Sequence, residues 1–442
     1  MMIFTRFARS SRSASSLALA FALASGVALT ATAIEAPAHA QKKKKSDAPE
    51  YSKGFVEAYT PIREKIQGET PDPAGAKPLV PALVASAQSG PEKLAAGQII
   101  ANLGGKIDDQ SLTLQGYELM VASGATEPNT TGTLNQLLFQ MYRDRGEFAK
   151  ARASLEKNIA ANFSSESAMT DGTTRTLGPD DYALMIAEMY FGEQQYDEGF
   201  AYLNGLVDAR RAAGQEVPER WLRRAFTVAY ENERQKEALG YISGLAETNP
   251  SPEIWNDAIE LTLYFNEYAN ADALDLLRLS RRMEQYKNSQ MLLEYVELLD
   301  ARRFPGEVTA VIDEGWNWGT VDRSDRYLVE SRKEAASRLD ADRRDLPKLA
   351  ADARASGADL QTVVVAGDTF LSYDQPAEAE EFYTKALTKS GVETPMVLTR
   401  LGIAQYDQGK YAEAIETFRK VDGARRDIAN LWAIYASQQT GG

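Results

Sequence analysis

Most of the side chains that enzymes use for covalent or metal chemistry are missing from this sequence. Its 442 residues include no cysteine and a single histidine, His39, which lies in a segment that we expect to be removed. Such a chain builds no Ser-His-Asp triad, no Cys-His pair and no thiolate or imidazole metal site. It also has neither of the common glycine-rich phosphate-binding fingerprints. Glycoside hydrolysis needs only two carboxylates, but among 63 acidic residues no pair stands out. We therefore expect no enzyme, no metal site and no cofactor.

Aromatic residues are better candidates for function. Phe191, Tyr230, Phe265 and Tyr406 each stand eight residues before a small residue that recurs along the chain, and Trp255 lies nearby. If their side chains face the same way, they form a row that can grip an extended or helical partner. The alternative is that they pack against the neighbouring helix, because aromatic residues at helical spacing are often core.

Arg220, Arg223 and Arg224 are the second candidate binding group. They stand close together in a chain whose formal net charge is −14, and Arg220 and Arg224 share one face of a helix. This basic group is suited to an anionic segment of a partner, although pairing with Glu219 or Glu231 is an equally good interpretation. The acidic charge of the whole chain repels phosphate backbones, so we expect no nucleic acid partner.

The elements that carry these residues are predicted to be helices. Apolar residues recur at helical spacing through 134–160, 182–211 and 253–282. Residues that stop helices gather at 68–78, 124–129, 249–252 and 391–395. We find no convincing run of alternating strand character, so the sequence predicts an all-α fold.

A repeat pattern organises these helices. Small residues are followed four positions later by large ones, and three of the six intervals between the first members of successive pairs are 35 residues long. The pairs are Ala151 with Leu155, Gly199 with Leu203, Ala238 with Ile242, Ala273 with Leu277, Val308 with Ile312, Ala379 with Tyr383, and Ala414 with Phe418. One interval of 71 residues, close to two repeats, predicts a degenerate repeat over 322–356 with helices at 327–339 and 346–354.

From Leu401 the chain reads LGIAQYDQGKYAEAIETFRK, and this segment resembles a tetratricopeptide repeat (TPR). The resemblance implies a right-handed helical solenoid of roughly eight to ten TPR or TPR-like helix pairs. The strongest matches predict a solenoid over 130–440, with TPR-like helices over 55–125. In this family the first helix of each pair lines a concave surface that typically receives a peptide or a helix from another protein. We therefore expect an interaction scaffold whose partner is a protein or a peptide.

Some TPR proteins clamp the C-terminal carboxylates of a partner, with Lys and Arg in the two slots that Arg220 and Arg224 occupy here. The preceding repeats of such proteins supply Lys and Asn. This sequence has Gln136, Gln140 and Met185 at those positions, so the pattern of the clamp is matched only in part.

Two further segments stand out from the repeats. The Ser/Thr-rich stretch 161–180 is predicted to be a mobile loop at one edge of the stack. The segment 315–319, GWNWG, contains two tryptophans, which either stack on a sugar or peptide or fill the join before the degenerate repeat.

The N-terminal segment predicts export. Residues 1–40 combine a basic start, an apolar Ala/Leu stretch and the small-x-small sequence at Ala38–Ala40, the features of a cleaved signal peptide. A flexible Lys-rich leader is expected over 41–54. We expect a periplasmic protein of the cell envelope, with secretion as second choice, that does not span a membrane. Binding of glycan or peptidoglycan remains the alternative function.

Overall fold

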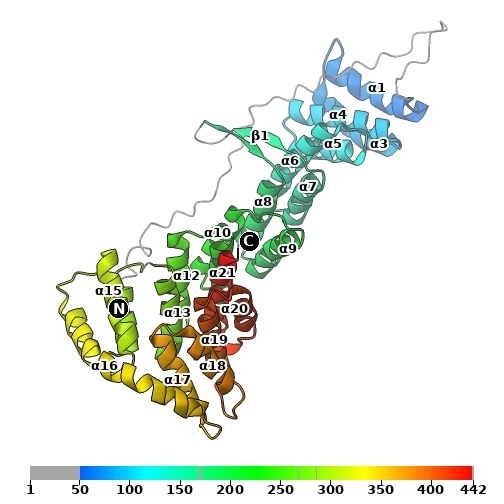
Figure 1. Ribbon diagram of the computed structural model, residues 1–442. Helices are drawn as coiled ribbons and strands as arrows, with labels where there is room; N and C mark the ends of the chain where they lie inside the picture. The colour runs from blue at the N-terminus through cyan, green and yellow to red at the C-terminus, as the bar shows by residue number, and fades with distance from the viewer. Residues whose placement is uncertain (1–49, 169–171, 267, 285, 441–442) are drawn as a thin grey trace. The chain divides into compact units, whose positions relative to one another are not determined.

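The computed structural model describes residues 50–168, 172–266, 268–284 and 286–440 (Figure 1). The predicted signal peptide, 1–40, lies outside these ranges, and so do residues 41–49 of the predicted leader. The chain forms two compact units, Met1–Leu203 and Asn204–Gly442. Within each unit, successive helices pack in pairs, which confirms the all-α class. In the part of the chain that the structure describes, no helix is both long and apolar enough to cross a membrane.

Unit 1 consists of helices and one β-hairpin. Its helices are α1 (Lys53–Gln67), α2 (Pro73–Ala76), η2 (Lys77–Leu79), α3 (Val80–Ser86), α4 (Gly90–Lys106), α5 (Gln110–Ala122), α6 (Pro128–Asp144), α7 (Phe148–Ala160), α8 (Pro179–Gly192) and the first part of α9 (Tyr196–Ala212). The pair α4 and α5 approaches closely because glycines face each other. A Cβ atom added to Gly97 would lie 2.6 Å from the carbonyl oxygen of Gly116.

The start of α4 is held by a buried carboxylate. Ser89 caps the helix, and the side chain of Glu92 accepts hydrogen bonds from the backbone N–H groups of Ser52, Gln88 and Ser89. These bonds favour the charged form, so the pKa of Glu92 is lowered to about 2. Because Ser52 is also the N-cap of α1, one side chain fixes the beginnings of two helices.

The Ser/Thr-rich segment after α7 differs from its prediction as a loop. Strands β1 (Ser165–Ala168) and β2 (Thr174–Leu177) pair in antiparallel register as a hairpin. Its base is fastened to the helices, since Gln136 Nε2 donates to Ser165 Oγ at 2.7 Å and to Tyr182 Oη at 2.9 Å. Threonine favours strands, and this local preference combines with the anchored base to pair residues 165–168 with residues 174–177.

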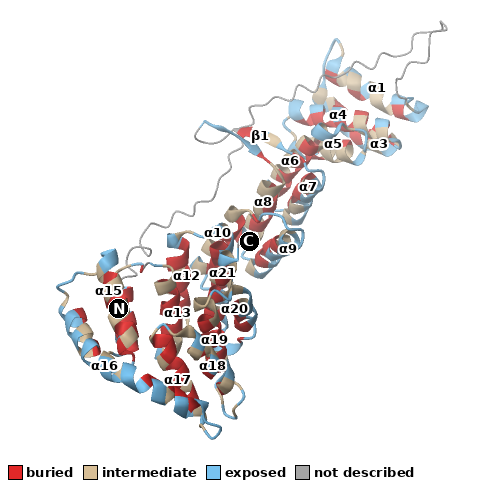
Figure 2. Ribbon diagram, in the orientation of Figure 1, coloured by how far each residue is buried: buried red, intermediate tan, exposed pale blue. Residues whose placement is uncertain are grey.

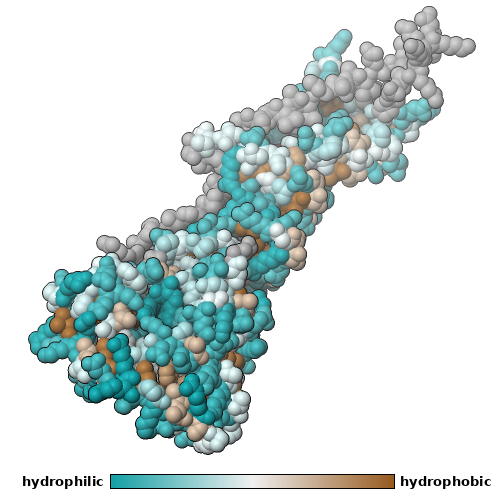
Figure 3. All heavy atoms as spheres, viewed as in Figure 1, coloured by the Kyte–Doolittle hydropathy of each residue, from teal (hydrophilic) through white to brown (hydrophobic). Residues whose placement is uncertain are grey.

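Unit 2 contains two runs of helices joined by one long helix. The first stack is α10 (Glu219–Glu231), α11 (Gln235–Thr248), α12 (Pro252–Phe265), α13 (Asn270–Arg282), α14 (Ser289–Leu299) and α15 (Pro305–Trp318). The second stack is α17 (Leu360–Ser372), α18 (Pro376–Ala386), α19 (Thr394–Asp407), α20 (Tyr411–Phe418), η3 (Gly423–Arg425) and α21 (Arg426–Gln439). Buried residues are frequent on α11, α12, α13, α17 and α19, and those of α12, α13 and α17 are visible in Figure 2. Hydrophilic residues cover most of the visible face of the unit (Figure 3).

The large members of two small-then-large pairs, Tyr383 and Phe418, each pack against a glycine of the preceding helix. A Cβ atom added to Gly367 would lie 2.6 Å from the ring of Tyr383, and one added to Gly402 would lie 2.5 Å from the ring of Phe418. In each case a glycine on the first helix makes room for a ring on the second helix of the same pair. Tight packing of this kind fixes the distance between the two helices.

The prediction of two short helices within 322–356 is wrong. Residues Arg326–Arg354 form one continuous helix, α16, with Pro347 inside it. The charged stretch 340–345, where a break was expected, stays helical and mostly exposed. Leu346 and Ala350 are buried one turn apart, so packing on both sides of Pro347 outweighs the hydrogen bond that a proline cannot donate.

Candidate functional site

Two of the predicted partner-binding residues lie in the protein interior. Phe191 is 6% exposed and its ring centroid lies 5.2 Å from that of Phe200. Trp255 is 4% exposed and meets Tyr435 of α21 edge-on, with ring centroids 5.5 Å apart. These positions agree with the core interpretation that the sequence left open.

Tyr406 is also engaged within the protein. Its ring stacks on Tyr435 at 5.5 Å and meets Trp432 and Tyr411 at 5.5 and 5.2 Å. The side chain is only partly exposed. Its aromatic contacts therefore hold the second stack together.

The three arginines of the predicted basic group lie on the first turns of α10. Arg223 is exposed and its Nε donates to Glu219 Oε1 at 2.6 Å, which is the local pairing that the sequence offered as an alternative. Arg220 and Arg224 are partly buried. Because ion pairs between exposed side chains contribute little to stability, Arg223 can exchange its partner at small cost.

Tyr230 and Phe265 are brought together, and they belong to a longer aromatic surface. Phe226 and Tyr230 lie one turn apart on α10 with ring centroids 6.0 Å apart, and Tyr230 meets Phe265 of α12 at 6.2 Å. Tyr264 follows at 5.4 Å from Phe265 and is 59% exposed. We call these four residues the aromatic strip.

On each of the two helices that carry the strip, one face is buried and the strip lies on the other face, at the surface. On α10, Trp221, Ala225 and Val228 are buried and pack into the first stack, which leaves the turn containing Phe226 and Tyr230 partly exposed. On α12, Ser251 caps the N-terminus by accepting from the N–H of Ile254 at 3.3 Å. The strip is thus carried by two rigid neighbouring elements.

The sequence indicated only half of this strip. Phe226 occupies a repeat position that usually packs inside a helix pair, and Tyr264 lies outside the register that selected Phe265. Phe226 lies one helical turn before Tyr230, and Tyr264 is the neighbour of Phe265 in the chain. A search around the two selected residues would therefore have found both. Only the packing of α10 beside α12 shows that all four rings adjoin.

The strip offers flat apolar faces and phenolic hydroxyls. Among the described residues, no group of three or more His, Cys, Asp or Glu side chains is arranged to hold a metal ion. Aromatic side chains supply large contact areas at small entropic cost, and tyrosine also donates and accepts hydrogen bonds. This chemistry suits binding of a peptide or a sugar.

The most strongly perturbed carboxylates of unit 2 are structural. Burial raises the pKa of Asp275, but Arg400, Arg425 and Arg278 outweigh this effect and hold the pKa at about 2. Burial likewise raises the pKa of Glu307, and Arg278 lowers it to about 2. Both carboxylates are ionised and enclosed by arginines, so neither has the raised pKa of a general acid.

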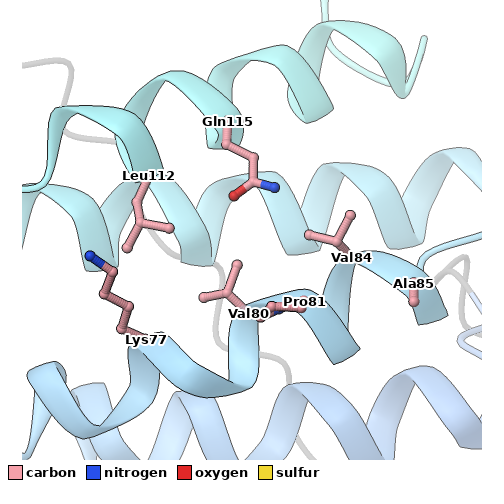
Figure 4. A pocket seen from close by; sticks show the side chains of 7 residues that line it. All are labelled: Lys77, Val80, Pro81, Val84, Ala85, Leu112 and Gln115. Carbon is pink, nitrogen blue, oxygen red and sulfur yellow. The ribbon is translucent and has the colours of Figure 1, made fainter.

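A shallow depression of about 450 Å³ lies between α3 and α5 in unit 1 (Figure 4). It is lined by Lys77, Val80, Pro81, Val84, Ala85, Leu112 and Gln115. Lys77 at its rim pairs with Asp109 at 2.7 Å. With mostly apolar walls and no converging polar groups, this depression provides no catalytic arrangement.

Comparison with known proteins identifies one segment. Residues 397–428, which comprise most of α19, all of α20 and the start of α21, match the family model described as tetratricopeptide repeat. No curated protein matches the chain.

Solved structures of repeat proteins are also similar, at low identity. A tetratricopeptide repeat protein from Parabacteroides merdae is 13% identical, with a TM-score of 0.23, and the match covers 62% of this chain and 99% of that one. The TPR2AB domain of yeast Sti1 in complex with pHSP90 is also 13% identical, with a TM-score of 0.22 and coverage of 70% and 97%.

Proposed function

We propose that this chain, whose residues 397–428 match the tetratricopeptide-repeat family model, is an interaction scaffold of the cell envelope. It holds a segment of a partner protein on the aromatic strip and performs no covalent chemistry. A protein-interaction role is what the repeat family supports in general. The strip and the location are the specific parts of the proposal.

The observation that carries the proposal is the exposure of the strip. Four adjoining aromatic rings could form a compact apolar cluster in a protein core. Here three of the rings are partly exposed, and the fourth, that of Tyr264, is 59% exposed. Contiguous exposed aromatic surface of this kind marks interaction sites. The exposed Arg223 lies one turn before Phe226 on the same helix, so a partner that covers the strip can also reach a cation.

The envelope location rests on the sequence of residues 1–40. Their basic start, apolar stretch and small-x-small end are typical of an export signal. The sequence contains no cysteine, so the fold does not depend on disulfide formation in an oxidising compartment.

Site-specific photocrosslinking tests the binding surface. A photoreactive amino acid replaces Tyr264 in the protein made by its native cells, and the crosslinked products are identified by mass spectrometry. The matched control position is Tyr327 on α16, which is 45% exposed but belongs to no aromatic cluster described above. We expect one defined protein adduct from position 264 and none of that mass from position 327.

A double variant then measures the contribution of the strip. Tyr264→Ala with Tyr230→Ala should weaken binding of the crosslinked partner at least about tenfold, since truncation of central aromatic residues commonly costs 2 kcal/mol or more. Equal adducts at both positions would contradict the proposed surface. Retention of peptidoglycan by the parent protein but not by the double variant would instead favour the glycan function.

A further inference from the structure

The aromatic strip has a ridged surface. Its successive ring centroids lie 6.0, 6.2 and 5.4 Å apart, and the successive ring planes are inclined to each other by 32°, 47° and 51°. Rings inclined by such angles cannot share one plane, so ridges and furrows alternate along the strip. Because the side chain of Tyr264 is 59% exposed, its ring projects from the surface and does not line a deep cleft.

The hydroxyl of Tyr230 stands in the middle of these rings. Within the part of the chain that the structure describes, the side chain has ring contacts with Phe226 and Phe265, and its hydroxyl has no hydrogen-bond partner. A phenolic O–H group is a hydrogen-bond donor. The strip therefore presents a donor to a carbonyl oxygen of a bound chain.

The helix ends beside the strip use their carbonyl oxygens internally. In α10 the carbonyl oxygens of residues 228–230 accept hydrogen bonds from the backbone N–H groups of residues 232–234 at 2.8–3.2 Å. In α12 the carbonyl oxygen of Thr262 accepts from Asn266 Nδ2 at 3.0 Å. Carbonyl groups in the last turn of a helix commonly bind groups outside the helix, but these are already engaged.

This distribution of donors and acceptors discriminates between peptide backbones. An ordinary extended segment turns some of its N–H groups towards the surface that it covers, and burying an N–H group without a partner costs free energy. Proline has no N–H group, while its carbonyl oxygen remains an acceptor. A proline-rich backbone therefore offers acceptors to a surface that offers a donor.

The spacing of the rings also fits a polyproline II helix. This helix rises about 3.1 Å per residue, so two residues advance about 6 Å, which matches the 5.4–6.2 Å between successive rings. Its conformation is formed before binding, so little entropy is lost when it is held. An α-helix bonds its carbonyl groups internally, and the hydroxyl of Tyr230 would meet only its side chains.

We propose that the aromatic strip binds a proline-rich segment in the polyproline II conformation. A carbonyl oxygen of the segment accepts a hydrogen bond from Tyr230, and its pyrrolidine rings lie between the aromatic ridges. The guanidinium of Arg223, one turn before Phe226 on α10, carries donors and no acceptor, which extends the same preference to one end of the strip. This inference rests on the function proposed above, because it names the kind of segment that the same surface holds.

Titration of the full chain with defined probes tests this inference. The first probe is a fluorescent decaproline peptide. A flexible Gly-Ser decapeptide and a helical peptide of Ala, Glu and Lys serve as matched probes, and a tetramer of N-acetylglucosamine represents glycan. Decaproline should bind at least about tenfold more tightly than each of the other three, because it alone combines a preformed extended backbone with the absence of N–H groups.

A conservative variant isolates the hydroxyl group. Tyr230→Phe keeps the ring that meets Phe226 and Phe265, and it should weaken decaproline binding about two- to tenfold, as expected for one lost hydrogen bond. Tyr264→Ala removes an outer ring and should weaken the same binding. The matched control is Tyr327→Phe on α16, which lies outside the strip and should leave decaproline binding unchanged.

Tighter binding of the Gly-Ser peptide, the helical peptide or the tetrasaccharide than of decaproline would overturn the inference. Decaproline binding that Tyr230→Phe leaves unchanged would overturn it as well. Photocrosslinking from position 264 separates this failure from failure of the proposed function. A protein adduct whose crosslinked segment contains no proline contradicts the polyproline II inference alone, whereas the lack of any protein adduct contradicts the proposed function itself.

Discussion

Single residues of this protein act chiefly by fixing where helices begin and how closely they pack. Glu92 is the clearest case, because its carboxylate accepts three backbone N–H groups and its pKa is lowered to about 2. A carboxyl group with a lowered pKa in the folded state stabilises the protein above its unfolded pKa. That contribution is lost as the pH falls through the folded value.

We predict that Glu92→Gln destabilises unit 1 by about 1–2 kcal/mol at neutral pH, the range of a lost helix cap. The difference from the parent protein should shrink as the pH falls from about 4.5 towards 2, because the parent loses the same charge there. Urea denaturation at several pH values measures both effects. A difference that stays constant down to pH 2 would show that the charge of Glu92 is not the cause.

Gly402 tests close packing at the residue scale. A Cβ atom there would meet the ring of Phe418, so Gly402→Ala should destabilise the protein by about 1–3 kcal/mol through overpacking. The matched control is Gly240 in the helix α11, where nothing lies within 4 Å of an added Cβ atom. Gly240→Ala should stabilise by up to about 1 kcal/mol, because alanine favours helices. Thermal unfolding of the two variants gives the comparison, and equal effects would contradict the packing argument.

At the scale of elements, α16 is the exception among the helix pairs. Its 29 residues run between the two stacks, and few of them are buried. A helix with so little packing depends more on its own propensity than its neighbours do. Its interior proline is therefore the position at which that propensity is weakest.

We predict that Pro347→Ala stabilises α16 by about 1–3 kcal/mol, because proline in a helix interior costs about 3 kcal/mol relative to alanine. Pro376 provides the control, since it stands in the first turn of α18, where proline is well tolerated. Pro376→Ala should change stability little. Hydrogen exchange of residues around 343–351 measures the local effect, and no gain in protection there would count against the prediction.

At the scale of the whole molecule, export is the feature with the widest consequences. If residues 1–40 are a signal peptide, the mature chain begins at Gln41 and loses Arg6, Arg9 and Arg12 with it. The exported protein is then more acidic than the precursor. Such a charge keeps it soluble and disfavours binding to nucleic acid.

We predict that the protein recovered from cells has Gln41 as its first residue, and that Ala38→Arg blocks this cleavage, because the processing site requires small residues. Intact-mass measurement of the purified protein distinguishes the two forms. The control is Ala36→Ser, which keeps a small residue near the site and should be processed normally. A parent protein that retains Met1 would refute export by cleavage.

The amino-acid sequence by itself determined the helical class and the pairing of helices. Helical periodicity depends on local spacing, and the small-then-large pairs, such as Ala414 with Phe418, lie within a single helix of a repeat. Both kinds of signal join residues close together in the chain. The sequence also selected Tyr230 and Phe265, since the repeat register gave them the same position on successive pairs.

Only the tertiary structure decided which candidate residues meet and which are covered. Trp255 lies against Tyr435, and Asp275 against Arg400, at separations of more than one hundred residues. No pattern with a period of 35 residues encodes such contacts. They arise because α16 continues as one helix and the second stack packs on α13. The same packing buried Trp255, engaged Tyr406 and left the strip around Tyr264 exposed.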